Sequence, residues 1–275
     1  MRHVAVLEGN SVPQENSASA VSSAPRTYVG TSGWHYKHWV GDFYPPRFAS
    51  EKMLAWYSRE FTTVEINNSF YRLPEEQTFE RWKEMVPQGF LFAVKASRFL
   101  THIKRLKDPE GPIKLFFSRA GHLREHLGPV LFQLPPRWKA DPGRLREFLE
   151  VLPARHRYVM EFRDDSWYTP EILGLLRTYN IALCLHDWHS AEWSRELTAN
   201  FVYIRFHGTT GKYAGNYPDH LLQRWAEQIQ CWRNIREVYA YFNNDIGGHA
   251  VRNAKTLRAM LQGSSPPAET REIAA

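Results

Sequence analysis

Two glutamates and a lysine stand where apolar segments of the sequence end, and these residue types can move protons and stabilise charge. Glu65 ends TTVE, Lys95 ends LFAVK and Glu161 ends YVME. Two carboxylates in one site can be held at different pKa values, so that one acts as an acid and the other as a base. A lysine beside them can stabilise developing negative charge or, once deprotonated, form a Schiff base. We favour the protonated lysine, because neighbouring carboxylates stabilise the charged form.

Other apolar segments also end in polar residues, whose chemistry suits an anionic or polyhydroxylated ligand. Arg163 and Arg205 carry planar guanidinium groups that match phosphate or carboxylate. The predicted catalytic residues are Glu65, Glu161, Lys95 and His207. The predicted substrate-binding residues are Asn67, Gln133, Arg163, Arg205, Gly208, Gly211, Lys212, Asn243, Trp34 and Tyr71.

A glycine-rich loop with the sequence HGTTGKYAG occupies residues 207–215. Barrels often bind phosphate after the seventh strand, and glycines allow backbone N–H groups to approach an anion. The spacing differs from that of a P-loop, and a surface loop without a ligand is the alternative. Aromatic residues in other loops, such as Trp34 and Tyr71, either stack on sugars or bases or pack the loops together.

Ion pairs offer a purely structural explanation of the charged residues. In that interpretation Glu65 neutralises Lys95, and Glu161 neutralises Arg163 or Arg205. The two interpretations are compatible, because a salt-bridge network can also hold a catalytic group in place.

The sequence contains no HExxH and no CxxC motif. A divalent metal remains an alternative, with the ligand set Glu65, Glu161, His186 and His207. Three cationic neighbours oppose such a site, so we predict no metal and no other cofactor. The two cysteines lie far apart in the sequence, and we expect reduced thiols in a cytoplasmic protein.

Strand and helix patterns alternate along the chain, which is typical of an α/β protein. We expect strands at residues 27–32, 63–67, 91–95, 130–133, 158–163, 181–186, 201–207 and 238–243. We expect helices at residues 50–61, 75–85, 113–126, 142–152, 169–179, 218–236 and 248–261. The helix after the sixth strand is weak or missing. Eight such units predict a single-domain (β/α)8 TIM-like barrel, with a doubly wound open sheet as the alternative.

Alternation within the strands indicates where the polar residues point. Lys95 shares a face with Ala93, and Arg205 shares a face with Tyr203, while the opposite faces are wholly apolar. The apolar faces suit packing under outer helices. Because barrels build their sites at the C-terminal ends of the strands, we expect the polar side chains to meet there.

Residues 1–26 and 263–275 lack a periodic pattern and are predicted to be disordered extensions of a folded part at residues 27–262. The net charge of +6 favours anionic partners, nucleic acid included. No apolar run approaches the length of a membrane span, so we expect no association with a membrane.

Taken together, the motifs resemble the YecE-like family, also called domain of unknown function 72. The resemblance rests on TSGW, FYP, VEINNSFYRLP, FAVKAS, LFQLPP, EFRDDSW, YIRFHG and YFNND. It covers about residues 27–262 and fits least well at residues 187–200. It implies a TIM-barrel fold and no established activity.

The leading hypothesis is an enzyme of the hydrolase, isomerase or lyase class. Its substrate would be anionic or sugar-like, with or without a phosphate group, and carboxylates would supply the acid–base chemistry. One alternative is a non-catalytic protein that binds a nucleotide or nucleic acid, which the basic charge and the loop aromatics favour. Another is an inert site retained in a scaffold protein.

Overall fold

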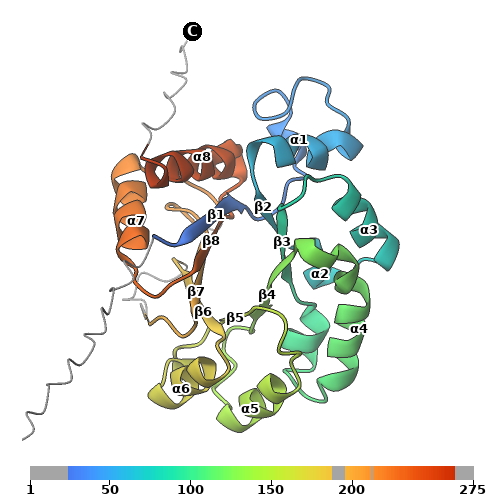
Figure 1. The fold of residues 1–275 in the computed structure, drawn as a ribbon, viewed down its shortest axis with the longest axis vertical. Helices are drawn as coiled ribbons and strands as arrows, with labels where there is room; N and C mark the ends of the chain where they lie inside the picture. The colour runs from blue at the N-terminus through green and yellow to red at the C-terminus, as the bar shows by residue number, and fades with distance from the viewer. Residues whose placement is uncertain (1–23, 188–195, 212, 264–275) are drawn as a thin grey trace, which may run out of the picture.

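The computed structural model describes residues 24–187, 196–211 and 213–263. Within this part, eight parallel strands form a nearly closed barrel surrounded by helices (Figure 1). The strands are β1 (Arg26–Thr31), β2 (Thr63–Ile66), β3 (Leu91–Lys95), β4 (Leu127–Gln133), β5 (Tyr158–Glu161), β6 (Ala182–His186), β7 (Phe201–Phe206) and β8 (Glu237–Phe242). The predicted single-domain (β/α)8 TIM-like barrel is therefore confirmed.

Helices follow the strands in the expected order. They are α1 (Met53–Glu60), α2 (Asn68–Tyr71), α3 (Glu76–Glu84), α4 (Glu110–Ala120), α5 (Pro142–Glu150), α6 (Pro170–Thr178), α7 (Asp219–Cys231) and α8 (His249–Leu261). A proline opens both α5 and α6, because the missing N–H of proline costs nothing in the first helical turn. Between β6 and β7, the described residues 187 and 196–200 contain no helix.

Several boundaries differ from the sequence-based expectation, and the helix expected at residues 218–236 already ends at Cys231. The helix expected at residues 113–126 is divided into α4 and a short 3₁₀ helix, Gly121–His126, in which Arg124 takes a positive φ of 50°. That conformation cannot continue a regular helix, and β4 begins directly afterwards. The strand expected to reach Arg163 ends at Glu161. Finally, the one-turn helix α2 gave no periodic signal, because four residues are too few to show one.

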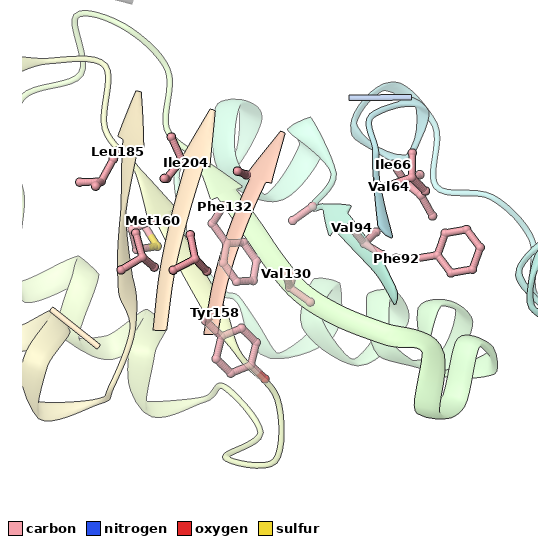
Figure 2. Packing of buried hydrophobic residues seen from close by; sticks show 14 of the residues in the cluster. Val64, Ile66, Phe92, Val94, Val130, Phe132, Tyr158, Met160, Leu185 and Ile204 are labelled. Carbon is pink, nitrogen blue, oxygen red and sulfur yellow. The ribbon is translucent and has the colours of Figure 1, made fainter. Parts of the chain in front are cut away.

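The two faces of the strands form two separate apolar clusters. Side chains such as Val64, Phe92 and Met160 point outward and pack with the helices (Figure 2). The inner cluster, which includes Ala93 and Tyr203, fills the barrel. The predicted alternation is thus correct, and the polar residues at the C-terminal strand ends lie beyond a packed apolar interior.

The joint between β1 and β2 is closed by side chains instead of a backbone ladder. The hydrogen-bonded strand order runs from β1 through β8 to β2, so these two strands are its ends. The hydroxyl group of Tyr57, on α1, accepts a hydrogen bond from Thr31 N at 2.9 Å and donates one to Thr63 O at 3.1 Å. A Cβ atom on Gly30 would lie 2.4 Å from Thr63 O, so only glycine permits this close approach.

None of the described helices combines the length and apolar character that a membrane span requires. Cys184 and Cys231 are both free thiols.

Candidate functional site

Arg205, on β7, is the centre of a network of buried charges. Its guanidinium group donates to Glu65 Oε1 at 2.9 Å and to Glu161 Oε2 at 2.7 Å. The arginine side chain is only 2% exposed, and neither glutamate is exposed at all. The structure thus brings together side chains from β2, β5 and β7, as the predicted inward face requires. We call the polar side chains at these strand ends the polar layer.

Glu65 is held by more than the arginine. Ser32 Oγ donates to its Oε1 at 2.8 Å, and Tyr203 OH donates to its Oε2 at 2.7 Å. Both carboxylate oxygens therefore have partners. A carboxylate held in one orientation by an arginine and two hydroxyl donors is typical of a preorganised site.

Glu161 forms ion pairs with two arginines, Arg205 and Arg163. Burial alone would raise the pKa of its carboxyl group, but the charges of Arg163 and Arg205 hold that pKa well below its usual value. Glu161 is therefore an ionised carboxylate at neutral pH.

Lys95, at the end of β3, has no carboxylate partner within ion-pair distance among the described residues. Its Nζ donates to Gln133 Oε1 at 2.6 Å and lies 4.2 Å from the centre of the Phe70 ring. The side chain is 9% exposed. Burial, with a contribution from the Arg205 charge, lowers the pKa of Lys95 to about 8.

His207 and Asp187 form a second titratable group beside the arginines. His207 Nδ1 lies 3.2 Å from Asp187 Oδ1, and its Nε2 lies 3.2 Å from an Arg163 nitrogen. Because arginine can only donate, Nε2 is the acceptor and Nδ1 carries the proton that faces Asp187. Tyr217 donates to the second oxygen of Asp187.

Burial shifts the pKa values of this pair toward the neutral forms. It lowers the pKa of His207 well below its usual range, so the imidazole is uncharged at neutral pH. It raises the pKa of Asp187 to about 6, although hydrogen bonds from backbone N–H groups oppose the change. Asp187 therefore titrates close to physiological pH.

The glycine-rich loop uses its backbone groups to support its own turn. Gly208 N donates to Tyr217 OH at 2.8 Å, and Tyr213 N donates to His207 O at 2.9 Å. Gly208 has a φ of 112°, and a Cβ atom there would lie 2.1 Å from Ala214 O. These two N–H groups are not available to an anion, and close backbone contact explains the glycine at position 208. Gly211 is exposed, and Lys212 lies outside the described residues.

The remaining predicted binding residues lie in different environments. Asn67 follows β2, and its buried Oδ1 has no hydrogen-bond partner among the described residues. Asn243 is buried after β8. Trp34 packs against Trp82 and Phe92, on the outer side of β3, and its contacts place it away from the polar layer. Tyr71 is 75% exposed at the end of α2.

Ser32, Tyr203 and Tyr217 were not among the residues predicted for the site. Tyr203 could have been found, because it lies two residues before Arg205 and therefore faces inward. Ser32 follows β1 directly, at the same level as the other strand ends. Tyr217 gave no signal, because its contact with Asp187 depends on the path of the loop that follows β7.

Among residues 24–187, 196–211 and 213–263, no group of three or more His, Cys, Asp or Glu residues is arranged to hold a metal ion. The four-residue ligand set considered from the sequence does not form such a group, since arginines occupy both of its glutamates. The expectation that no cofactor is needed stays a prediction.

A family model for proteins of unknown function, DUF72, matches residues 28–273. The chain belongs to this family. The chain is similar to the UPF0759 protein YunF of Bacillus subtilis (strain 168), with 29% identity over 85% of this chain and 94% of the relative. The YecE-like resemblance seen in the motifs is thereby confirmed.

Two solved DUF72 structures have the same fold. A DUF72 family protein from Thermotoga maritima MSB8 has a TM-score of 0.77 and 28% identity, covering 86% of this chain and 99% of its own. A DUF72 family protein from Enterococcus faecalis V583 has a TM-score of 0.72 and 20% identity, covering 86% of this chain and 95% of its own. The family description gives no reaction or substrate.

Proposed function

We propose that this protein is an enzyme that acts on a small anionic, sugar-like substrate at the C-terminal ends of the barrel strands. The observation that supports this best is the environment of Lys95. It is a buried cation whose hydrogen-bond partner is the amide of Gln133. A buried ammonium group without an anion in direct contact is costly. An anionic group on a ligand would supply that contact.

A hydroxyl-bearing ligand would also satisfy a buried acceptor that follows β2 directly. Asn67 Oδ1 lacks a partner among the described residues and lies two residues beyond Glu65 along the chain. Buried acceptors without a partner are uncommon in folded proteins and often belong to binding sites. A sugar hydroxyl can donate to this oxygen, which favours a polyhydroxylated substrate over inorganic phosphate alone.

Proton transfer would be carried out by the groups that titrate near neutral pH. These are Asp187, with a pKa of about 6, and Lys95, with a pKa of about 8. Groups whose pKa values lie on either side of the working pH are suited to act as an acid and a base. Glu161, and with it Glu65, would hold the arginines in position. The carboxylate chemistry expected from the sequence is therefore assigned to Asp187, acting with His207.

A binding experiment tests this proposal. The thermal unfolding temperature would be followed with glucose 6-phosphate, inorganic phosphate and glucose, because a ligand that binds the folded state raises it. We expect the phosphorylated sugar to stabilise the protein most. Lys95→Met should weaken that binding about tenfold, or about 1.4 kcal/mol. Lys114→Met, at an exposed position on α4, is the matched control and should bind normally.

The same panel would be assayed for turnover with wild type and Asp187→Asn, which keeps the size of the side chain. We expect the variant to bind with little change and to lose most of its activity. If no anionic ligand stabilises the wild type, or if Lys95→Met binds normally, the proposed function is wrong.

A nucleic-acid-binding function has separate support at the residues that follow β2 and β3. Tyr71 is 75% exposed and Phe99 is 47% exposed, and Arg72 and Arg98 beside them are exposed as well. Exposed aromatic and basic side chains suit single-stranded nucleic acid. Binding to a labelled oligonucleotide should weaken steeply with added salt and on Tyr71→Ala substitution. Binding that does not change with salt concentration would rule out the nucleic-acid-binding function.

A further inference from the structure

Lys95 differs from an ordinary buried lysine in the partners that surround its amine. Glu65 and Glu161 are both paired with arginines. The Lys95 amine instead contacts a neutral amide oxygen and the face of an aromatic ring. Neither partner holds a proton on the nitrogen as firmly as a carboxylate would. Among the described residues the amine therefore makes no ion pair, although the charges of Glu161 and Glu65 act on it from farther away and oppose the lowering of its pKa.

The chemical consequence is an amine that is available near neutral pH. Burial and the Arg205 charge lower the pKa of Lys95 to about 8. At about pH 7.5, the unprotonated fraction of such a lysine exceeds that of a surface lysine roughly 200-fold. Lysines activated in this way by burial and a neighbouring cation are typical nucleophiles toward carbonyl groups.

We propose that Lys95 forms an imine with a carbonyl group of the substrate. The inference rests on the proposed function and narrows it to substrates that carry an aldehyde or ketone beside their anionic group. Keto acids and sugar phosphates in their open-chain form have this chemistry. The remaining side chains would position the carbonyl carbon against Nζ.

The reaction balances without an oxidant or reductant. The Nζ lone pair forms a C–N bond with the carbonyl carbon, and the π electrons of the C=O bond move to oxygen, which takes a proton. The nitrogen then gives one of its own protons to that oxygen, which leaves as water and gives the protonated imine. This ion withdraws electrons from the adjacent carbon, so a neighbouring C–H or C–C bond can break; its electron pair forms an enamine, which then takes up a proton from solvent to give the imine again. Water later reverses the first step and releases the amine. Among the reaction classes above, this favours a lyase or an isomerase.

Borohydride trapping tests the inference directly, because hydride reduces an imine to a stable secondary amine. The full chain would be incubated with pyruvate, dihydroxyacetone phosphate or acetone and then reduced, and the adduct would be located by peptide mass spectrometry. We expect adducts from the two anionic carbonyl compounds at Lys95, at least tenfold above those at any surface lysine. Their yield should rise with pH and level off above about pH 8, unlike that of an ordinary lysine.

Lys95→Met and Lys95→Arg should abolish this adduct, and Lys114→Met should retain it. Adducts from acetone that match those from the anionic compounds would support the imine and count against the anionic substrate. Binding of glucose 6-phosphate without any adduct at Lys95 would overturn the inference and leave the proposed function in place. Adducts spread evenly over the lysines would also overturn it.

Discussion

Lys95 Nζ donates to Gln133 Oε1 at 2.6 Å, so an amide occupies the position where a carboxylate would form a salt bridge. The two residues end the neighbouring strands β3 and β4. This pairing leaves the lysine with a low pKa, because an amide stabilises an ammonium ion less than a carboxylate does.

Replacing the amide should move the pKa of Lys95 in a direction set by the new side chain. Gln133→Glu adds a negative charge at hydrogen-bond distance, and we expect the pKa to rise by one unit or more above about 8. Gln133→Leu removes the acceptor and should lower the pKa of Lys95. The pH dependence of reductive methylation at Lys95, followed by mass spectrometry, measures both shifts. Equal shifts in the two variants would show that Gln133 does not control the lysine.

Lys95→Met should stabilise the fold while it weakens ligand binding. The folded-state pKa of about 8 lies below the ordinary 10.5, so the charged form opposes folding. This cost is present in full below about pH 8 and disappears as the pH rises toward 10.5. We expect the variant to gain roughly 1–3 kcal/mol in the free energy of unfolding at neutral pH. Urea unfolding at several pH values measures this, and a variant that is less stable than wild type would contradict the argument.

Arg205→Met should destabilise the protein strongly. The substitution leaves Glu65 without its arginine and removes one of the two arginines of Glu161, and both glutamates are fully buried. Removing one partner of a buried ion pair typically costs about 3–5 kcal/mol. Arg252→Met is the control, because that arginine forms an exposed pair with Asp42, worth about 1 kcal/mol or less. Similar unfolding free energies for the two variants would refute the central role of Arg205.

Tyr57→Phe should weaken the joint between β1 and β2. The substitution removes the acceptor of the buried Thr31 N–H and the donor to Thr63 O. A buried N–H without a partner costs about 1–3 kcal/mol. Hydrogen exchange at the Thr31 amide should accelerate in step with this loss. Tyr71→Phe, at an exposed position, is the control and should change neither the free energy of unfolding nor the exchange rate of the Thr31 amide. A Thr31 amide that stays protected in Tyr57→Phe would contradict the closure by Tyr57.

The sequence was sufficient to predict the barrel, because each strand carries its own pattern. Alternation correctly separated inward residues such as Arg205 from outward residues such as Val64. The same reasoning brought Glu65 and Glu161 together, since the C-terminal ends of parallel strands meet in a barrel.

The pairing of charges could not be predicted, because it depends on geometry across the barrel. The sequence-based interpretation paired Glu65 with Lys95, which is wrong, because Glu65 pairs with Arg205. The structure shows that the guanidinium group reaches both glutamates at once. Similarly, the glycines of the loop at residues 207–215 suggested an anion, but Gly208 is required by the backbone of Ala214. Composition does not distinguish a loop that binds a ligand from one that folds onto itself.

The hydrogen bond from Ser32 Oγ to Glu65 Oε1 crosses from the end of β1 to β2. Glu65 therefore belongs both to the polar layer and to the contacts that close the barrel between β1 and β2. A ligand that competes for this carboxylate would also weaken the contact between β1 and β2. Ligand binding at the strand ends and the rigidity of the barrel are therefore coupled. A Glu65 variant that loses activity must accordingly be tested for separation of β1 from β2 before the loss is attributed to chemistry.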